Sequence, residues 1–249
     1  MLLELQSTII YGPIQSRRIG TSLGINLLQA MTKVCTFDCL YCQYGWTDFS
    51  CLEKAEYPAP EQVARELESA LDKLSTPPRY ITFSGNGEPT LHPDFGRIVD
   101  LVNDIRDGRA PETGTAILSN STTVSRPGIR EALSRLDLRI MKLDAGSETM
   151  FASYNRPAPG ITIEEITEGL AALDDVTIQS LFTKGPAGNF AEPNITEWIA
   201  RLKRISPVLV QVYTLDRGFP SREIEKLERD ELEEIRSRLE DEGISAKAF

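Results

Sequence analysis

The chain is 249 residues long and carries 27 basic against 37 acidic side chains, which gives a formal net charge of −10. A hydrophobic content of 41% is that of an ordinary globular protein and excludes disorder of the whole chain. No apolar run approaches the roughly 18 residues that span a membrane, and the start, MLLELQSTII, lacks the basic region of a signal peptide. We therefore expect one cytoplasmic domain with no membrane partner.

The N-terminal segment is rich in residues that form turns. These residues are Gly12, Pro13, Gly20 and Gly24. Because glycine and proline mark turns between extended segments, we expect residues 1–30 to form a β-hairpin extension. The hairpin would pack on a core of residues 31–217, and a helical segment would follow at 218–249.

Beyond residue 78, short apolar runs alternate with segments of helical periodicity. The apolar runs are Arg79–Ser84, Thr115–Ser119, Leu138–Asp144, Val176–Thr183 and Val208–Leu215. The helical periodicity falls within residues 63–74, 95–105, 163–173 and 195–205. With one more strand before Cys35, six strand–helix units follow one another, fewer than the eight that close a TIM barrel. Continuously apolar strands are typical of a parallel sheet, so the sequence predicts an α/β fold with a partial (β/α)6 barrel of the TIM type.

Local signals predict where several helices begin. Thr162 with Glu165, and Asn194 with Glu197, have the spacing of an N-cap residue and its reciprocal glutamate. Between Arg222 and Glu242 there are ten acidic and five basic residues, interrupted by regularly spaced apolar ones. The apolar residues are Ile224, Leu227, Leu232, Ile235 and Leu239. This pattern predicts a C-terminal amphipathic helix whose acidic face lies in water.

Three of the four cysteines, Cys35, Cys39 and Cys42, lie within eight residues. Disulfides are rare in a reducing compartment, so this density indicates a metal ion or a cluster. A structural zinc site needs four protein ligands, and here Cys51 stands alone and the single histidine, His92, is far along the chain. Three thiolates on a [4Fe–4S] cluster would instead leave one iron open, as a catalytic metal requires.

The CxxxCxxC loop, with Tyr41 before its third cysteine, resembles the motif of the radical S-adenosylmethionine (SAM) superfamily. The resemblance implies that Cys35, Cys39 and Cys42 hold a [4Fe–4S] cluster and form the catalytic centre, with SAM on the fourth iron. One electron from the cluster would cleave SAM to methionine and a 5′-deoxyadenosyl radical, which takes a hydrogen atom from the substrate. An electron donor such as flavodoxin or ferredoxin is implied as a partner, and Tyr41 is implied as a cofactor-binding residue.

The second predicted strand ends in Gly85-Asn86-Gly87-Glu88. Alone, this segment is equally well interpreted as an ordinary glycine-rich turn. Beside the cysteine loop it is similar to the Gly-Gly-Glu motif of the superfamily, in which backbone and carboxylate hold the SAM amino group. The sequence departs from that motif because Asn86 separates the two glycines.

Polar residues at the ends of later strands are further candidates for SAM binding. The resemblance implies contacts to the ribose and the carboxylate of SAM from Ser119, Asn120, Asp144 and Gln179. For each of these residues, a structural hydrogen bond is an equally good explanation, since buried polar groups normally have partners.

Three segments of the chain, Tyr11–Gly20, Lys142–Gly146 and Asn155–Pro157, resemble a subgroup of Fe–S oxidoreductases. That subgroup is distantly similar to the enzymes of tRNA wybutosine synthesis, so the implied substrate is unidentified, with tRNA or a peptide as candidates. Guanidinium groups bind phosphate or carboxylate through paired hydrogen bonds, although exposed arginines are also common on any surface. The arginines that could serve this purpose are Arg17, Arg18, Arg156 and Arg217.

The alternative hypothesis is a non-enzymatic binding module that carries zinc or an iron–sulfur cluster on an α/β scaffold. It predicts a fourth protein ligand, for which Cys51 is the candidate, and no cleavage of SAM. Under either hypothesis we expect no auxiliary cluster, because Cys51 by itself cannot hold one.

Overall fold

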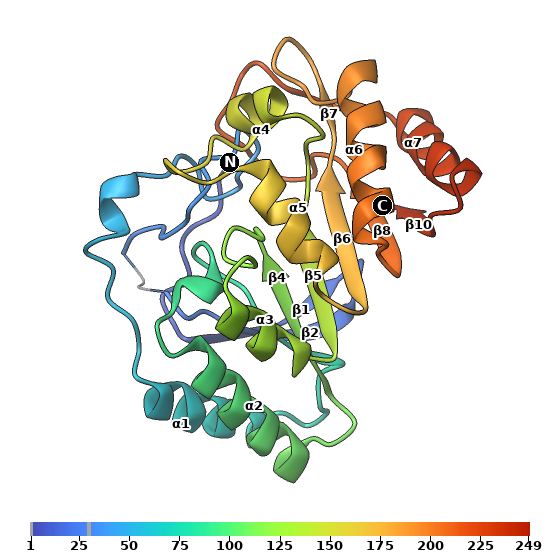
Figure 1. The fold of residues 1–249 in the computed structure, drawn as a ribbon. Helices are drawn as coiled ribbons and strands as arrows, with labels where there is room; N and C mark the ends of the chain where they lie inside the picture. The colour runs from blue at the N-terminus through green and yellow to red at the C-terminus, as the bar shows by residue number, and fades with distance from the viewer. Residues whose placement is uncertain (1, 29–30) are drawn as a thin grey trace.

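The computed structural model describes residues 2–28 and 31–249 (Figure 1). Within these residues the main sheet has eight strands in the order β1-β2-β3-β4-β5-β6-β8-β10. Its strands are β1 (Ile10–Ser16), β2 (Gly20–Ile25), β3 (Tyr80–Phe83), β4 (Gly114–Ser119), β5 (Leu138–Lys142), β6 (Val176–Leu181), β8 (Leu209–Tyr213) and β10 (Ala246–Ala248). Strand β1 pairs antiparallel with β2, and the strands from β2 to β10 run parallel. A small second sheet pairs β7 (Thr183–Lys184) with β9 (Glu225–Lys226).

Helices connect the successive parallel strands. They are α1 (Pro60–Leu71), α2 (Phe95–Arg109), α3 (Pro127–Ser134), α4 (Glu148–Tyr154), α5 (Ile163–Ala171), α6 (Glu192–Ile205) and α7 (Arg229–Asp241), with short 3-10 turns η1 (Phe49–Cys51) and η2 (Pro89–Leu91). Figure 1 shows α2, α3, α5 and α6 following one another along one side of the sheet. The six strands from β2 to β8 with their helices confirm the predicted partial (β/α)6 barrel. None of the described helices is long and apolar enough to cross a bilayer.

Strand β2 belongs both to the N-terminal hairpin and to the parallel sheet. It pairs with β1 on one side and with β3 on the other, so the first core strand lies inside the range 1–30 predicted as an extension. Residues 1, 29 and 30 of that range lie outside the described residues. Strand β2 is buried although several of its residues are small. At Gly24 a small residue is needed, because a Cβ there would lie 2.2 Å from the ring of Tyr11, which packs directly over this strand.

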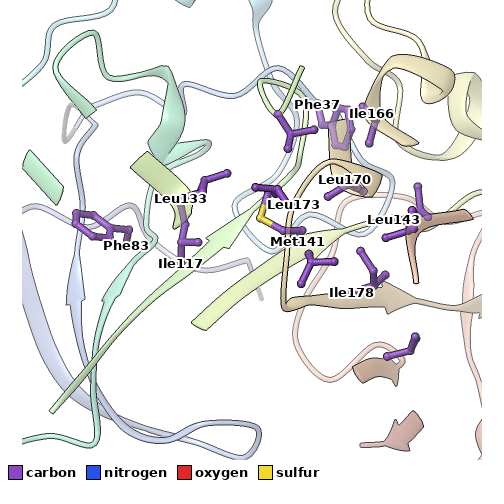
Figure 2. Close-up of a cluster of buried hydrophobic side chains, with 14 of the residues drawn as sticks. Phe37, Phe83, Ile117, Leu133, Met141, Leu143, Ile166, Leu170, Leu173 and Ile178 are labelled. Carbon is purple, nitrogen blue, oxygen red and sulfur yellow. The ribbon is translucent and has the colours of Figure 1, made fainter. Parts of the chain in front are cut away.

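The core lies between the sheet and the helices (Figure 2). Neighbouring strands contribute Phe83, Ile117, Met141 and Ile178, each at most 1% exposed. Leu170 of α5 packs against the same cluster. Burying a side chain of this size stabilises the fold by about 1.5–3 kcal/mol, so this layer holds the strands in register and fixes where their carboxyl ends lie.

One of the two predicted helix starts is confirmed and the other is wrong. The Thr162 hydroxyl oxygen accepts the backbone N–H of Glu165 at 3.2 Å, so Thr162 caps α5 as expected. Helix α6 begins at Glu192, before the predicted cap Asn194. The Asn194 side chain accepts the backbone N–H of Gly146 at 2.7 Å instead, and this tertiary contact outweighs its capping propensity.

The C-terminal amphipathic helix is confirmed but begins later than the apolar spacing predicted. Glu228 and Glu231 form a capping box that starts α7 at Arg229. Ile224 and Leu227 therefore precede the helix, and both are buried beside β9. Strand β10, which the sequence analysis missed, follows α7 and extends the sheet beyond β8.

Candidate functional site

The cysteine loop, residues 34–42, lies against segments that follow β3, β4 and α4. The Val34 N–H donates to the carbonyl of Asn86 at 2.9 Å, just after β3. The Asn120 side chain, just after β4, donates to Cys35 Sγ at 3.5 Å. Asn155, at the end of α4, donates to Cys39 Sγ at the same distance. The loop is therefore fixed at the carboxyl edge of the sheet, where α/β barrels place their chemistry.

The three predicted cysteines are free thiols, of which Cys35 and Cys39 are buried and Cys42 is half-buried. Burial raises the pKa of Cys35 to about 11 and the pKa of Cys39 to about 12, and repulsion from Cys42 adds to both increases. Cys39 and Cys42 belong to one turn, because the Cys42 N–H donates to the Cys39 carbonyl at 3.1 Å, and all three thiols interact with the Lys33 ammonium. Protonated thiols are poor ligands, so a bound cation would have to displace these protons.

A buried cation, Lys33, accompanies the three thiols. Its side chain is 7% exposed and its ammonium donates to the Gly45 carbonyl at 2.8 Å. Burial lowers the pKa of Lys33, but attraction to Cys42, Cys35 and Cys39 outweighs burial and raises it above its ordinary value. An ammonium in this position compensates negative charge on the sulfurs.

This donor set fits an iron–sulfur cluster better than a single ion. Within residues 2–28 and 31–249, no three His, Cys, Asp or Glu side chains are arranged as ligands of one metal ion. A cubane cluster does not need that arrangement, because each thiolate binds a different iron. Three clustered thiols, a buried ammonium and two amide donors to sulfur together match what such a cluster requires.

The predicted Gly85–Glu88 turn docks the cysteine loop onto the sheet. Gly87 has φ +149°, and a Cβ there would lie 1.8 Å from the Val34 carbonyl oxygen. Gly85 has φ +129°, and its Cβ would lie 2.6 Å from Asn26 Oδ1. Asn86 is fully buried, and its side chain bonds to the backbone of Gln6 in both directions. Both glycines are thus required by close packing.

The Glu88 carboxylate brings three predicted residues together. It accepts the Ser119 hydroxyl at 2.9 Å, the Thr90 hydroxyl at 2.6 Å and the Asn120 backbone N–H at 2.5 Å. Burial raises the pKa of Glu88, although these hydrogen bonds oppose the increase. Glu88, Ser119 and Asn120 therefore form one buried group that joins β3 to β4 beside the cysteine loop.

A second buried group surrounds Asp144. Its carboxylate accepts hydrogen bonds from the Tyr41 hydroxyl and from Asn155 Nδ2, the latter at 2.8 Å. The Lys142 ammonium forms an ion pair with Asp144 at 3.0 Å. Burial lowers the pKa of Lys142, but attraction to Asp144 and Tyr213 raises it overall. Asp144 thus connects the end of β5 to the cysteine loop.

Tyr213, at the end of β8, joins this group to the turn of the hairpin. Its hydroxyl accepts the Lys142 ammonium at 2.6 Å and donates to Gln179 Oε1 at 3.2 Å, which is the contact made by the predicted residue Gln179. The Arg18 guanidinium lies over the Tyr213 ring at 4.4 Å from its centre. Among the described residues Arg18 forms no ion pair, whereas Arg17 pairs with Asp216 at 2.8 Å.

The other two candidate arginines flank the cysteine loop. Arg156 pairs with Asp38 at 3.1 Å and lies over the ring of Trp46, which is 47% exposed. Arg217 donates to Gln43 Oε1 at 3.2 Å. Arg156 and Arg217 therefore border the same edge as the cysteines.

The roles of Lys33, Asn155 and Tyr213 were not predicted from the sequence. Lys33 carries a usable signal, because it lies two residues before the first motif cysteine. The contacts of Asn155 with Cys39 and of Tyr213 with Lys142 carry no local signal, since each pair is more than 70 residues apart along the chain.

Residues 30–190 match the Radical SAM superfamily, and the chain belongs to this superfamily. The "UPF0026 protein" of Helicobacter pylori (strain 26695) is 31% identical over 230 residues, which cover 90% of the chain and 71% of that protein. "UPF0026 protein MJ1312" of Methanocaldococcus jannaschii is 32% identical over 204 residues, 80% of the chain. The chain spans 61% of the length of that second relative.

A solved structure of TYW1 with a lysine–pyruvate adduct bound has the same fold, with a TM-score of 0.65 at 15% identity. The similarity covers 90% of this chain and 75% of TYW1. Radical SAM proteins use a [4Fe–4S] cluster and SAM, and these are the cofactors that superfamily membership gives this chain.

Proposed function

We propose that the chain is a radical SAM enzyme in which Cys35, Cys39 and Cys42 ligate the [4Fe–4S] cluster. When bound, the cluster supplies the electron that cleaves SAM and so allows hydrogen abstraction from a substrate. The observation that carries the proposal is the gathering of three free thiols beside Lys33 at the carboxyl edge of the sheet. The proposed enzyme acts in the cytoplasm, and its electrons come from a one-electron donor such as flavodoxin or ferredoxin.

The SAM-binding wall is proposed to consist of the polar residues around the cysteine loop. They are Tyr41, Gly85, Asn86, Gly87, Glu88, Ser119, Asn120, Asp144 and Gln179. Two groups of hydrogen bonds support this assignment, because Glu88 joins Ser119 and Asn120, and Asp144 joins Tyr41. These residues orient the cofactor and exclude water from it.

The Cys39→Ala variant tests the ligand assignment after anaerobic reconstitution with iron and sulfide. We expect loss of the visible iron–sulfur absorbance and of 5′-deoxyadenosine formation with dithionite and SAM. Cys51→Ala is the matched control, because Cys51 is a free cysteine outside the motif, and it should retain both properties. A complete cluster in Cys39→Ala contradicts the assignment. If the wild-type protein instead binds one zinc per chain and Cys51 is protected from thiol reagents, the binding module is favoured.

The substrate is proposed to be RNA, with tRNA as the first candidate. Arg156 stacked on the exposed ring of Trp46 offers a cation and an aromatic surface together, which suits a stacked base and its phosphate. Arg18, which lacks an acidic partner among the described residues, adds positive charge near Lys142. The overall charge of −10 means that binding depends on this local group.

Binding of bulk tRNA as a function of salt tests the RNA assignment. We expect Arg156→Gln and Trp46→Leu to weaken binding by several-fold, and Arg156→Gln to reduce its salt dependence. Arg97→Gln is the control, because Arg97 is also exposed and ion-paired, in its case with Glu61, but it lies in α2 against α1 and not beside the cysteine loop. If the wild-type protein binds tRNA no better than Arg156→Gln, the substrate is not RNA and a peptide takes its place.

A further inference from the structure

A short segment, residues 154–158, runs along the cysteine loop and fixes its shape. The N–H of Leu40 donates to the Tyr154 carbonyl, and that of Asp38 donates to the Asn155 carbonyl, both at 3.1 Å. At the other end, the Ala158 N–H donates to the Thr36 carbonyl at 2.9 Å. The segment contains the Asn155–Pro157 motif, and its backbone contacts hold the Asn155 side chain in place.

The Asn155 amide nitrogen lies within hydrogen-bond distance of a cysteine sulfur, and also of the Tyr41 hydroxyl at 3.2 Å. The side chain is 1% exposed, and Nδ2 lies 3.5 Å from Cys39 Sγ and 2.8 Å from Asp144 Oδ2. Amide orientation is assigned from hydrogen-bond partners, and the Asp144 carboxylate, which forms an ion pair with Lys142, only accepts hydrogen bonds. Nitrogen must therefore face Asp144, and the same NH2 group faces the sulfur.

Asn120 forms the corresponding contact on the opposite side of the loop. Its Nδ2 donates to Cys35 Sγ at 3.5 Å and to the Thr36 hydroxyl at 2.9 Å. Its Oδ1 accepts the Thr122 backbone N–H at 3.0 Å, which fixes the amide orientation here as well. Two of the three motif sulfurs thus receive a side-chain N–H donor from separate elements.

Hydrogen bonds to ligand sulfurs tune the potential of an iron–sulfur cluster. Reduction adds negative charge, part of which lies on the thiolate sulfurs. A fixed N–H donor stabilises the reduced cluster more than the oxidised one, and therefore raises the reduction potential. Low dielectric at the buried Cys35 and Cys39 strengthens this effect.

We propose that Asn120 and Asn155 are positioning residues that raise the reduction potential of the cluster by donating hydrogen bonds to Cys35 and Cys39. The proposal rests on the proposed function, because it requires these cysteines to be cluster ligands. It assigns to Asn155 a role in electron uptake, separate from any contact with SAM or substrate.

The test is an anaerobic redox titration of reconstituted holoprotein, followed by the paramagnetic resonance signal of the reduced cluster. We expect Asn155→Leu and Asn120→Leu each to shift the midpoint to more negative potential, and the double variant to shift it further. Asn103→Leu is the matched control, because Asn103 donates its amide to the Arg135 carbonyl on the helical side and should leave the midpoint unchanged.

The outcomes separate this inference from the proposed function. Unchanged midpoints in both variants, with the same iron content as the wild type, overturn the inference and leave the ligand assignment intact. If Asn155→Leu takes up too little iron to titrate, the Asn120→Ala variant is titrated instead, because Asn120 is half-exposed. A more negative midpoint potential in Asn120→Ala supports the proposal, and an unchanged midpoint potential overturns it. A cluster that persists in Cys39→Ala would instead refute the proposed function itself.

Discussion

Gly87 is the residue at which the cysteine loop and the turn after β3 come closest together. The sequence pattern indicated a glycine-rich turn, but it could not show that the Val34 carbonyl occupies the space of a Gly87 side chain. Similarly, the motif identified Cys35, Cys39 and Cys42, whereas the contacts of Asn120 and Asn155 with two of these sulfurs became visible only in three dimensions. Local spacing defines ligands, and tertiary contacts define what surrounds them.

We expect Gly87→Ala to destabilise the fold by about 1–3 kcal/mol, because the positive φ and the close carbonyl both oppose a Cβ. Displacement of Val34 should also reduce iron uptake at the nearby Cys35. Urea unfolding and iron content measure the two effects. Gly108→Ala is the control, since it lies in α2 with nothing within 4 Å of its Cβ, and it should be neutral or slightly stabilising. Equal unfolding midpoints for the two variants would contradict the packing argument.

At the level of elements, the apolar runs predicted strands β3, β4, β5, β6 and β8. Helical periodicity predicted five of the helices, α1, α2, α5, α6 and α7, because burial of one helix face repeats along the sequence. Element ends were predicted less well. Thr162 caps α5 through a local hydrogen bond, which spacing reveals, whereas Asn194 bonds to Gly146 across the fold. Strand β10 was missed because three residues are too few for a periodic signal.

Helices α5 and α6 are joined by an ion-pair group that should respond to acid. Hydrogen bonds from Arg204 and Arg201 lower the pKa of Glu164 to about 2 from the ordinary 4.5. A lowered pKa in the folded state means that this stabilisation is complete above pH 4.5 and is lost as the pH falls toward 2. The Glu164 side chain is 48% exposed, so solvent screening keeps the contribution small.

We therefore expect Glu164→Gln to lower the urea midpoint slightly at pH 6 and to have no effect near pH 2. The difference between the urea midpoints of the wild type and of Glu164→Gln, measured from pH 6 to pH 2, gives the stabilisation by these ion pairs. A difference that stays constant from pH 6 to pH 2 would show that Glu164 stabilises the protein by packing alone.

At the scale of the whole molecule, strand β10 covers what would otherwise be the edge of β8. Ala246 lies opposite Val210, and the Phe249 N–H donates to the Val212 carbonyl at 3.0 Å. Truncation after residue 243 would expose this edge and leave the apolar face of α7 partly uncovered. The single-domain prediction further implies that β8 and the rest of the core unfold together.

We expect the truncated chain to unfold at lower urea concentration, still in one cooperative transition seen alike by fluorescence and by circular dichroism. Lys247→Ala, an exposed change within β10, should leave the midpoint unchanged. Two separate transitions in the wild-type chain would show that the hairpin or the C-terminal segment folds independently of the barrel.

The turn between β1 and β2 contacts the segment after β8, so the two margins of an open barrel meet at Arg17 with Asp216 and at Arg18 with Tyr213. An exposed ion pair contributes at most about 1 kcal/mol, so separating the two margins at this ion pair costs little free energy. Paired spin labels at the exposed positions 15 and 217, which leave this ion pair in place, would accordingly report the distance between the two margins. The distance between the two labels should increase when a large substrate binds between the margins, and it should stay unchanged when SAM alone is added.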